Sequence, residues 1–189
     1  MRRINLMKRF TTYTDESGIS TRKKFIVATA LVDNEGCEEF QELLSEIEKT
    51  TGKKKKWADV GVMTRTRYTR LLLKKGVFNS CTVYFSVFNN KQDYISLVSS
   101  QVAKSIINHA DGAAYKATIF LDLVNNRMTE GVQKELKSYK IRYKKIRALD
   151  DTNNVGLKFI DAMCGLIRDI ENSNIDPSYK TIYKKLKEI

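Results

Sequence analysis

The run most able to do chemistry is Asp15-Glu16-Ser17-Gly18, near the start of this chain of 189 residues. It follows Arg9–Thr14, whose alternation of polar and apolar residues predicts a half-buried strand. Two adjacent acids at the end of a strand, followed by a small residue and a glycine, direct carboxylates toward the mouth of a cleft while the backbone turns. Carboxylate oxygens are the ligands that hard divalent cations prefer. A hairpin turn is the alternative interpretation, because Asp, Ser and Gly all favour turns.

A third acid, Asp122, ends the apolar run Ala117–Leu121, which is typical of a strand. In open sheets with helical crossovers, ligands bind beyond the carboxyl ends of strands, so a charge at this position is well placed for a site. The alternative is an ordinary strand-ending Asp that leads into a turn at Asn125-Asn126.

A fourth acid, Asp161, lies in the helical segment Leu157–Ile167, which is apolar nearly all round and therefore predicted to be buried. An unpaired carboxylate there would cost several kcal/mol of desolvation, so Asp161 must be paired, protonated or bound to a cation. A core Asp satisfied by a lysine or a backbone amide is the structural alternative. Gly165, four residues further on, predicts that this helix approaches the sheet closely.

Hydrophobic periodicity predicts strands alternating with helices. Strands are expected at residues 9–14, 25–32, 81–88, 117–122 and 141–149, and the first two pair as a hairpin. Helices are expected at residues 40–52, 68–76, 94–106, 130–139 and 155–170, and another follows Pro177. This order predicts an α/β fold with one mixed sheet of about five strands covered by helices. We expect one domain over residues 1–175 and a C-terminal helical tail over 176–189 packed on it.

Charge and cysteine content limit the function classes. The chain has 34 Lys and Arg against 22 Asp and Glu, a formal net charge of +12, which favours a nucleic-acid partner. Its three cysteines lie far apart without a Cys-x-x-Cys motif, which disfavours a zinc site or a disulfide framework and suits a reducing compartment. Met1–Leu6 has no apolar signal core, and no long apolar run is present, so we expect a cytoplasmic protein without a membrane partner.

The basic residues predicted to contact nucleic acid begin with a lysine run and a tryptophan. The run can clamp the phosphate backbone while the indole stacks on a base, or it can be a solvated loop with the indole in the core. The candidates are Lys53, Lys54, Lys55, Lys56, Trp57, Arg65, Arg67 and Lys158, and Lys144, Lys145 and Arg147 extend the basic surface.

Other chemistries find little support. Ser17 lacks the Gly-x-Ser-x-Gly elbow and a partner base that a nucleophilic serine needs. His109, the single histidine, stands at the polar end of a long predicted helix and is interpreted as structural. No glycine-rich phosphate loop is present, which disfavours hydrolysis of nucleoside triphosphates.

Together, four segments resemble the domain-of-unknown-function 3800 family, a bacterial and phage group similar to ribonuclease H-like nucleases and transposases. They are Tyr13-Thr14-Asp15-Glu16-Ser17-Gly18, Lys56-Trp57, the strand-ending Asp122, and Asn154-x-Gly156-Leu157-x-x-x-Asp161-x-x-x-Gly165. The resemblance extends to Arg168. It implies a ribonuclease H-like sheet on which Asp15, Asp122 and Asp161, with Glu16 adjacent, converge on one or two Mg²⁺ or Mn²⁺ ions.

Two residues depart from the family pattern. The family has a glutamate shortly before Lys-Trp, where this chain has lysines; Asp59 or Glu46 could substitute. A Gln often precedes the last Asp by three residues, where this chain has Lys158, which could pair with Asp161 directly and displace a metal. Substituting Asp161 by Asn should preserve or raise stability if Asp161 is a metal ligand, and lower it if Lys158 is its partner.

These observations lead to two functional hypotheses. The first is a metal-dependent nuclease in which Asp15, Glu16, Asp122 and Asp161 are catalytic and two metal ions serve the in-line displacement of a phosphodiester. The second is a binding-only module for nucleic acid or protein that kept the fold and lost the chemistry. A role in phage defence or a mobile element, a homodimer, and a partner protein encoded in the same operon all stay open, as does the choice between RNA and DNA.

Overall fold

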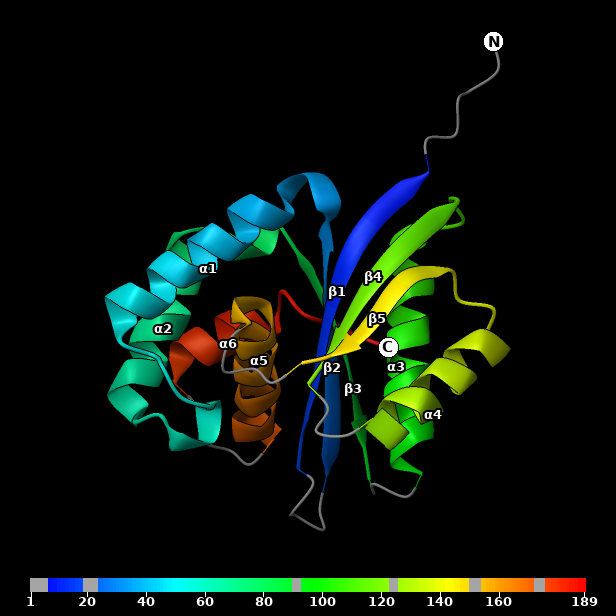
Figure 1. Ribbon diagram of the computed structural model, residues 1–189. Helices are drawn as coiled ribbons and strands as arrows, with labels where there is room; N and C mark the ends of the chain where they lie inside the picture. Colours follow the sequence, from blue (N-terminus) through cyan, green and yellow to red (C-terminus); the bar gives the residue numbers. More distant parts are fainter. Residues whose placement is uncertain (1–6, 19–23, 90–92, 123–125, 150–153, 172–175) are drawn as a thin grey trace.

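The computed structural model describes residues 7–18, 24–89, 93–122, 126–149, 154–171 and 176–189 (Figure 1). Its strands are β1 Lys8–Ser17, β2 Phe25–Asp33, β3 Thr82–Phe88, β4 Tyr115–Leu121, β5 Tyr143–Ala148 and β6 Lys187–Glu188. Its α-helices are α1 Cys37–Thr51, α2 Val62–Lys74, α3 Tyr94–Ala110, α4 Asn126–Ser138, α5 Val155–Glu171 and α6 Pro177–Tyr183, and short 3-10 turns cover Asn34–Gly36, Trp57–Asp59 and Val77–Asn79.

All six strands belong to one mixed sheet in the order β5-β4-β1-β2-β3-β6. β1, β2 and β3 form an antiparallel meander, and β4 and β5 lie parallel to β1 on its other side. Helix α4 joins β4 to β5, because parallel strands require a crossover connection. β4 ends at Leu121 beside Thr14 of the central strand β1, and β1 continues along β2 as far as Ser17.

Helices cover both faces of the sheet, which explains the nearly continuous apolar sequence of β2. One face carries α1, α2, α5 and α6 and the other α3 and α4, as Figure 1 shows. The larger core packs Tyr13 of β1 and Phe85 of β3 against the long apolar helix α5. The smaller core packs Phe10 and Phe25 against α3 and α4. The site must therefore lie at the sheet's end, because both faces are filled.

Every strand and helix expected from periodicity is present, and the largest differences lie at the ends of elements. β1 runs on to Ser17, so Asp15 and Glu16 are strand residues that pair with Ala28 and Val27 of β2. The alternative interpretation of this run as a hairpin turn is therefore wrong for the two acids. The expectations for Met1–Leu6 and for a turn containing Asn125 lie outside the described residues.

The C-terminal segment is only partly helical. Asp176 caps α6, since its Oδ1 accepts from the Ser178 amide at 2.9 Å. Tyr179 and Ile182 of this helix are buried in the larger core. The chain then adds β6 as a sixth strand, parallel to β3, where a helical tail was expected. No helix within the described ranges is long and apolar enough to cross a membrane.

Candidate active site

The Asp15-Glu16 pair lies near the end of β1, and its two side chains point to opposite faces of the sheet. This follows from the two-residue period of a strand. Asp15 lies under α5, where the buried Cys164 thiol donates to the Asp15 backbone carbonyl at 3.1 Å. Glu16 lies on the α3 side and accepts a hydrogen bond from the Tyr94 hydroxyl. Asp15 is 5% exposed, so its carboxylate is taken almost fully out of water.

Asp122 is the first residue after β4, and the backbone continues the sheet pairing there. Its amide donates to the Thr14 carbonyl at 3.0 Å, so it stands beside the Asp15 position of the neighbouring parallel strand. Asp161 reaches the same region from the middle of α5, which crosses β1. Acids from β1, the end of β4 and α5 thus lie in one region, near enough for the charges of Asp122 and Asp161 to act on Asp15.

Burial, with a smaller contribution from neighbouring acids, raises the pKa of Asp15, Glu16 and Asp161. The pKa of Asp15 is raised well above its ordinary value, first by burial and then by the charges of Glu16, Asp161 and Asp122. The pKa of Glu16 is raised from 4.5 to about 7, mainly by burial, against the Tyr94 hydrogen bond that lowers it. Burial also raises the pKa of Asp161. In the absence of a further cation, these surroundings therefore favour the protonated forms of the buried carboxyl groups.

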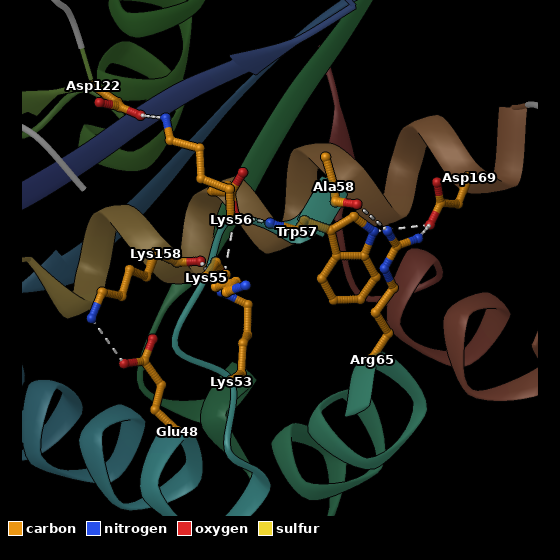
Figure 2. A network of polar contacts seen from close by, with 11 residues as sticks. Glu48, Lys53, Lys55, Lys56, Trp57, Ala58, Arg65, Asp122, Lys158 and Asp169 are labelled. Carbon is orange, nitrogen blue, oxygen red and sulfur yellow. Dashed lines mark hydrogen bonds and ion pairs between the residues drawn. The ribbon is translucent and has the colours of Figure 1, made fainter. Parts of the chain in front are cut away.

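Two lysine ammonium groups lie beside these carboxylates (Figure 2). Lys56 Nζ lies 3.2 Å from Asp122 Oδ2 and is the more solvent-exposed of the two. Lys53 Nζ lies 3.9 Å from Asp161 Oδ2, and its side chain is completely buried. Lys53 also reaches the Lys158 carbonyl at 3.3 Å and lies over the Tyr68 ring, 5.3 Å from the centroid. Both ammonium groups belong to the loop between α1 and α2.

The carboxylates suit a divalent cation in kind, but their side chains are not gathered into a coordination group. Within the ranges described, no three His, Cys, Asp or Glu side chains form a set that could hold a metal ion. Asp122 faces Lys56, Asp161 accepts from the Trp57 amide at 2.7 Å, and Glu16 lies on the other face of the sheet from Asp15. Carboxylate oxygens are nevertheless the kind of ligand that Mg²⁺ and Mn²⁺ prefer.

Trp57 anchors the lysine loop onto α5. Its ring is 1% exposed, its Nε1 donates to Asp169 Oδ2 at 2.9 Å, and Arg65 stacks over it 5.2 Å from the centroid. Arg65 Nη1 also pairs with the same Asp169 oxygen at 3.1 Å. Since the Trp57 amide binds Asp161, this one residue fixes both the loop that carries Lys56 and the carboxylate below it.

Gly165 serves this anchor and not the sheet contact that we expected. A Cβ at Gly165 would lie 2.1 Å from Cδ1 of Trp57, so the glycine makes room for the indole. The close approach of α5 to the sheet occurs at the start of the helix, at Gly156, where a Cβ would lie 2.5 Å from the Tyr13 ring. Spacing along a helix identified the correct face but could not say which neighbour each glycine meets.

Gly165→Ala is therefore expected to destabilise the protein by about 1–3 kcal/mol, the usual cost of overpacking a core. For a chain of this size, that lowers the melting temperature by about 2–4 °C per kcal/mol. Gly36→Ala is the matched control, because nothing lies within 4 Å of its added Cβ. Thermal melts by circular dichroism give the comparison, and equal melting temperatures for the two variants would show that Trp57 is loosely held.

The residues predicted to bind nucleic acid divide into two groups. Lys54, Lys55, Lys56 and Arg67 lie at the surface or partly so, as a role in binding requires. Lys53 and Trp57 are each 1% exposed, so neither a phosphate clamp nor a base-stacking ring fits them, and the interpretation of Trp57 as a core residue is the correct one. Arg65 is mostly buried on Asp169, and Lys158 is paired with Glu48 at 3.3 Å.

The structure also separates the residues that could replace the family glutamate. Glu46 pairs with Lys75 on the outer side of α1, and Asp59 is exposed. The acid that reaches the site's edge from α1 is Glu48, which binds Lys158. The Lys158–Asp161 pair that the sequence allowed is not formed, because Glu48 binds Lys158 and Lys53 lies beside Asp161 instead.

Two further polar residues singled out in the sequence have structural partners. Ser17 accepts from Arg168 Nη1 at 2.9 Å, which agrees with the absence of a serine-nucleophile motif. His109 packs edge-on against Phe10 and lies 3.5 Å from Asp33, and burial lowers its pKa. Sequence reasoning missed Tyr94 and Asp169, whose importance depends on contacts between segments distant in the chain.

The raised pKa of Glu16 predicts how stability depends on pH. A carboxyl group that titrates at about 7 when folded and at 4.5 when unfolded binds more protons in the folded state between these values. The contribution of Glu16 to the free energy of unfolding is therefore fully present below pH 4.5 and is lost as the pH rises through about 7. In metal-free buffer, Glu16→Gln should melt close to the wild type at pH 4.5 and above it at pH 8. Equal melting differences at both pH values would contradict the shift.

Comparison with known proteins supports the fold. No family model matches the chain, and no curated protein matches it. A chain of the solved structure of the PCNA:RNase HII complex from Archaeoglobus fulgidus is similar to it, with a TM-score of 0.55 and 11% identity over 93% of this chain and 87% of that one. This likeness and the mixed sheet covered by helices show a ribonuclease H-like α/β fold.

Proposed function

We propose that this protein is a divalent-metal-dependent nuclease that hydrolyses phosphodiester bonds of RNA or DNA. The observation that carries the proposal is the approach of Asp122, after β4, and Asp161, on α5, to the buried Asp15 of β1, whose pKa is raised first by burial and then by the charges of the neighbouring acids. A cluster of repelling acids in a partly buried position is typical of functional sites. The similarity to a structure that contains RNase HII supports the same reaction class by analogy of fold.

In this proposal, Asp15, Asp122 and Asp161 hold one or two Mg²⁺ or Mn²⁺ ions. A bound ion would activate water and stabilise the leaving oxygen. The chain's own residues prepare the site: Trp57 fixes Asp161 through its amide, and the β1–β4 pairing sets Asp122 beside Asp15. Lys56 balances Asp122 at 3.2 Å, and a cation bound to Asp122 would have to displace this exposed ammonium group.

The exposed lysines and the net charge of +12 support nucleic acid as the partner. The proposal also includes action in the cytoplasm and assembly with a second copy or with a partner protein from the same operon. Both parts depend on the nuclease function. A resemblance to the domain-of-unknown-function 3800 family remains a proposal of the same kind, and it rests on the motif residues quoted above.

One observation favours the second candidate, a binding-only module. Lys53 and Lys56 already lie on Asp161 and Asp122, so two of the acids have a cationic partner without any metal. A module that has lost the chemistry would keep these pairs permanently. The two candidates differ in whether a divalent ion can displace Lys56.

Titration calorimetry with Mn²⁺ separates the candidates. We expect the wild type to bind Mn²⁺ and Asp122→Asn to bind it at least about 10-fold more weakly, because an amide oxygen replaces a charged ligand. Lys56→Met should bind Mn²⁺ more tightly than the wild type, because the competing ammonium is gone.

Glu35→Gln is the matched control, since it removes one negative charge from an exposed position away from the site. It should bind Mn²⁺ as the wild type does. Absent binding in the wild type, or equal binding in Asp122→Asn and in the control, would reject the metal site and favour the binding-only module.

A further inference from the structure

A polar cavity of about 510 Å³ lies beside the acid cluster, between α1 and the start of α5. Four lysines line it against a single glutamate: Lys49, Lys53, Lys54 and Lys158, with Glu48. Glu48 is committed to Lys158 at 3.3 Å and the buried Lys53 to Asp161 at 3.9 Å, so the exposed Lys49 and Lys54 give the cavity its excess of positive charge. Figure 2 shows Lys158 and Glu48 pointing toward one another from the two helices.

The cavity also receives the positive end of a helix. Asn154 and Val155, at the start of α5, line its wall. Asn154 Oδ1 accepts from the Leu157 amide at 3.0 Å, which caps this helix of 17 residues. The first amides of a helix and the partial positive charge of its dipole favour an anion. Lys49 and Lys54 are at least partly exposed, so their ammonium groups can reach an anion that enters from solvent.

This cavity is joined to the acid cluster by one buried side chain. Lys53 Nζ lies 3.3 Å from the Lys158 carbonyl and 3.9 Å from Asp161 Oδ2. The loop makes a second connection, because Lys54 lines the cavity while Lys56 lies on Asp122. Two residues of extended chain span at most roughly 7 Å. An anion in the cavity is therefore a near neighbour of whatever the acids bind.

We propose that this cavity is a subsite for a backbone phosphate of the nucleic acid, next to the bond that would be hydrolysed at the acid cluster. The inference rests on the proposed nuclease function. It adds a second fixed contact between the protein and the nucleic acid, which sets the position of the nucleic-acid strand across β1 and α5. The cavity exceeds the size of one phosphate, and Gln41 and Ser45 on its wall provide polar contacts for the attached sugar. Buried Lys53 acts here as a positioning residue for Lys158 and Asp161.

Binding of fluorescent single-stranded oligonucleotides, measured by anisotropy in EDTA, tests the subsite without any cleavage. Lys49→Gln/Lys54→Gln should lower the slope of log K against log salt by about 0.7, because one phosphate of the strand is no longer neutralised. The control Lys134→Gln/Lys137→Gln removes the same charge from α4 and should leave the slope near that of the wild type. Equal slopes in both double variants would overturn the proposal, as would the absence of binding by the wild type.

A neutral methylphosphonate, placed in turn at each linkage of the oligonucleotide, locates the contact. The wild type should lose affinity at one linkage, and Lys49→Gln/Lys54→Gln should show no further decrease at that linkage, because the interaction partners are already separated. Additive decreases would overturn the subsite. Inorganic phosphate that competes as well as the oligonucleotide would also overturn it and assign the cavity to a free anion. A normal result here with no metal-dependent cleavage would reject the nuclease function alone.

Discussion

Asp122→Asn is expected to lose metal-dependent strand cleavage by about 100-fold or more while keeping nearly the wild-type stability. The activity falls because Asp122 is proposed as a direct metal ligand, and even outer partners of metal ligands cost 10–100-fold when removed. Stability should hardly change, because the ion pair that this substitution weakens is with Lys56, whose side chain is 55% exposed. Such pairs contribute at most about 1 kcal/mol, which is about 4 °C or less in melting temperature for this size.

The measurement pairs a cleavage assay with Mn²⁺ and a thermal melt of the same preparation. Glu35→Gln serves again as the control of equal charge and should match the wild type in both. A variant that cleaves normally would remove Asp122 from the site. A variant that melts far below the wild type would show that Asp122 holds the end of β4 in place.

Asp161→Asn is expected to lose cleavage and stability together. Lys53 is completely buried, and the Asp161 carboxylate lies 3.9 Å from its ammonium group. Removing one partner of a buried pair leaves an uncompensated charge, so we expect a cost of about 3 kcal/mol, the lower part of the usual range. That corresponds to roughly 6–12 °C in melting temperature. The sequence suggested stabilisation for a metal ligand at this position, and the Lys53 contact reverses that expectation.

A double substitution separates the effect of the unpaired Lys53 charge from the effect of changing the Asp161 side chain. Asp161→Asn/Lys53→Met removes both buried charges and should recover most of the stability that Asp161→Asn loses, because an apolar replacement of a buried pair is often neutral. Activity should stay absent in both. If Asp161→Asn melts at or above the wild type, the carbonyls of Lys55 and Lys158 are sufficient partners for Lys53.

The places of Asp122 and Asp161 in the fold were predictable because local sequence marks each of them. Asp122 follows an apolar strand, and Asp161 interrupts an apolar helix, so burial and topology together bring them to Asp15. The alternating pattern could not place the end of β1, because Asp15 and Glu16 continue the strand as polar residues. Once Asp15 and Glu16 are known to be strand residues, the two-residue period of a strand places their side chains on opposite faces of the sheet.

The burial or exposure of each lysine in the run Lys53–Lys56 was not predictable from sequence. Four consecutive lysines are typical of a solvated loop, yet Lys53 is buried while Lys54, Lys55 and Lys56 are exposed or partly so. Its burial depends on three distant groups: the Lys158 carbonyl, the Asp161 carboxylate and the Tyr68 ring. Contacts of this kind join segments far apart in the chain, and periodicity carries no information about them.

The most direct test of the central claim is cleavage by the purified chain itself. The wild-type protein is incubated with labelled single-stranded RNA, single-stranded DNA, the RNA duplex, the DNA duplex or the RNA–DNA hybrid. Each reaction contains Mg²⁺, Mn²⁺ or EDTA, and Asp15→Asn purified in the same way is assayed in parallel. We predict that at least one substrate is cut with a divalent ion, that EDTA stops the reaction, and that Asp15→Asn reduces the rate by about 100-fold or more. Cleavage that persists equally in Asp15→Asn, or no cleavage of any substrate by the wild type with either ion, would contradict the proposed nuclease function.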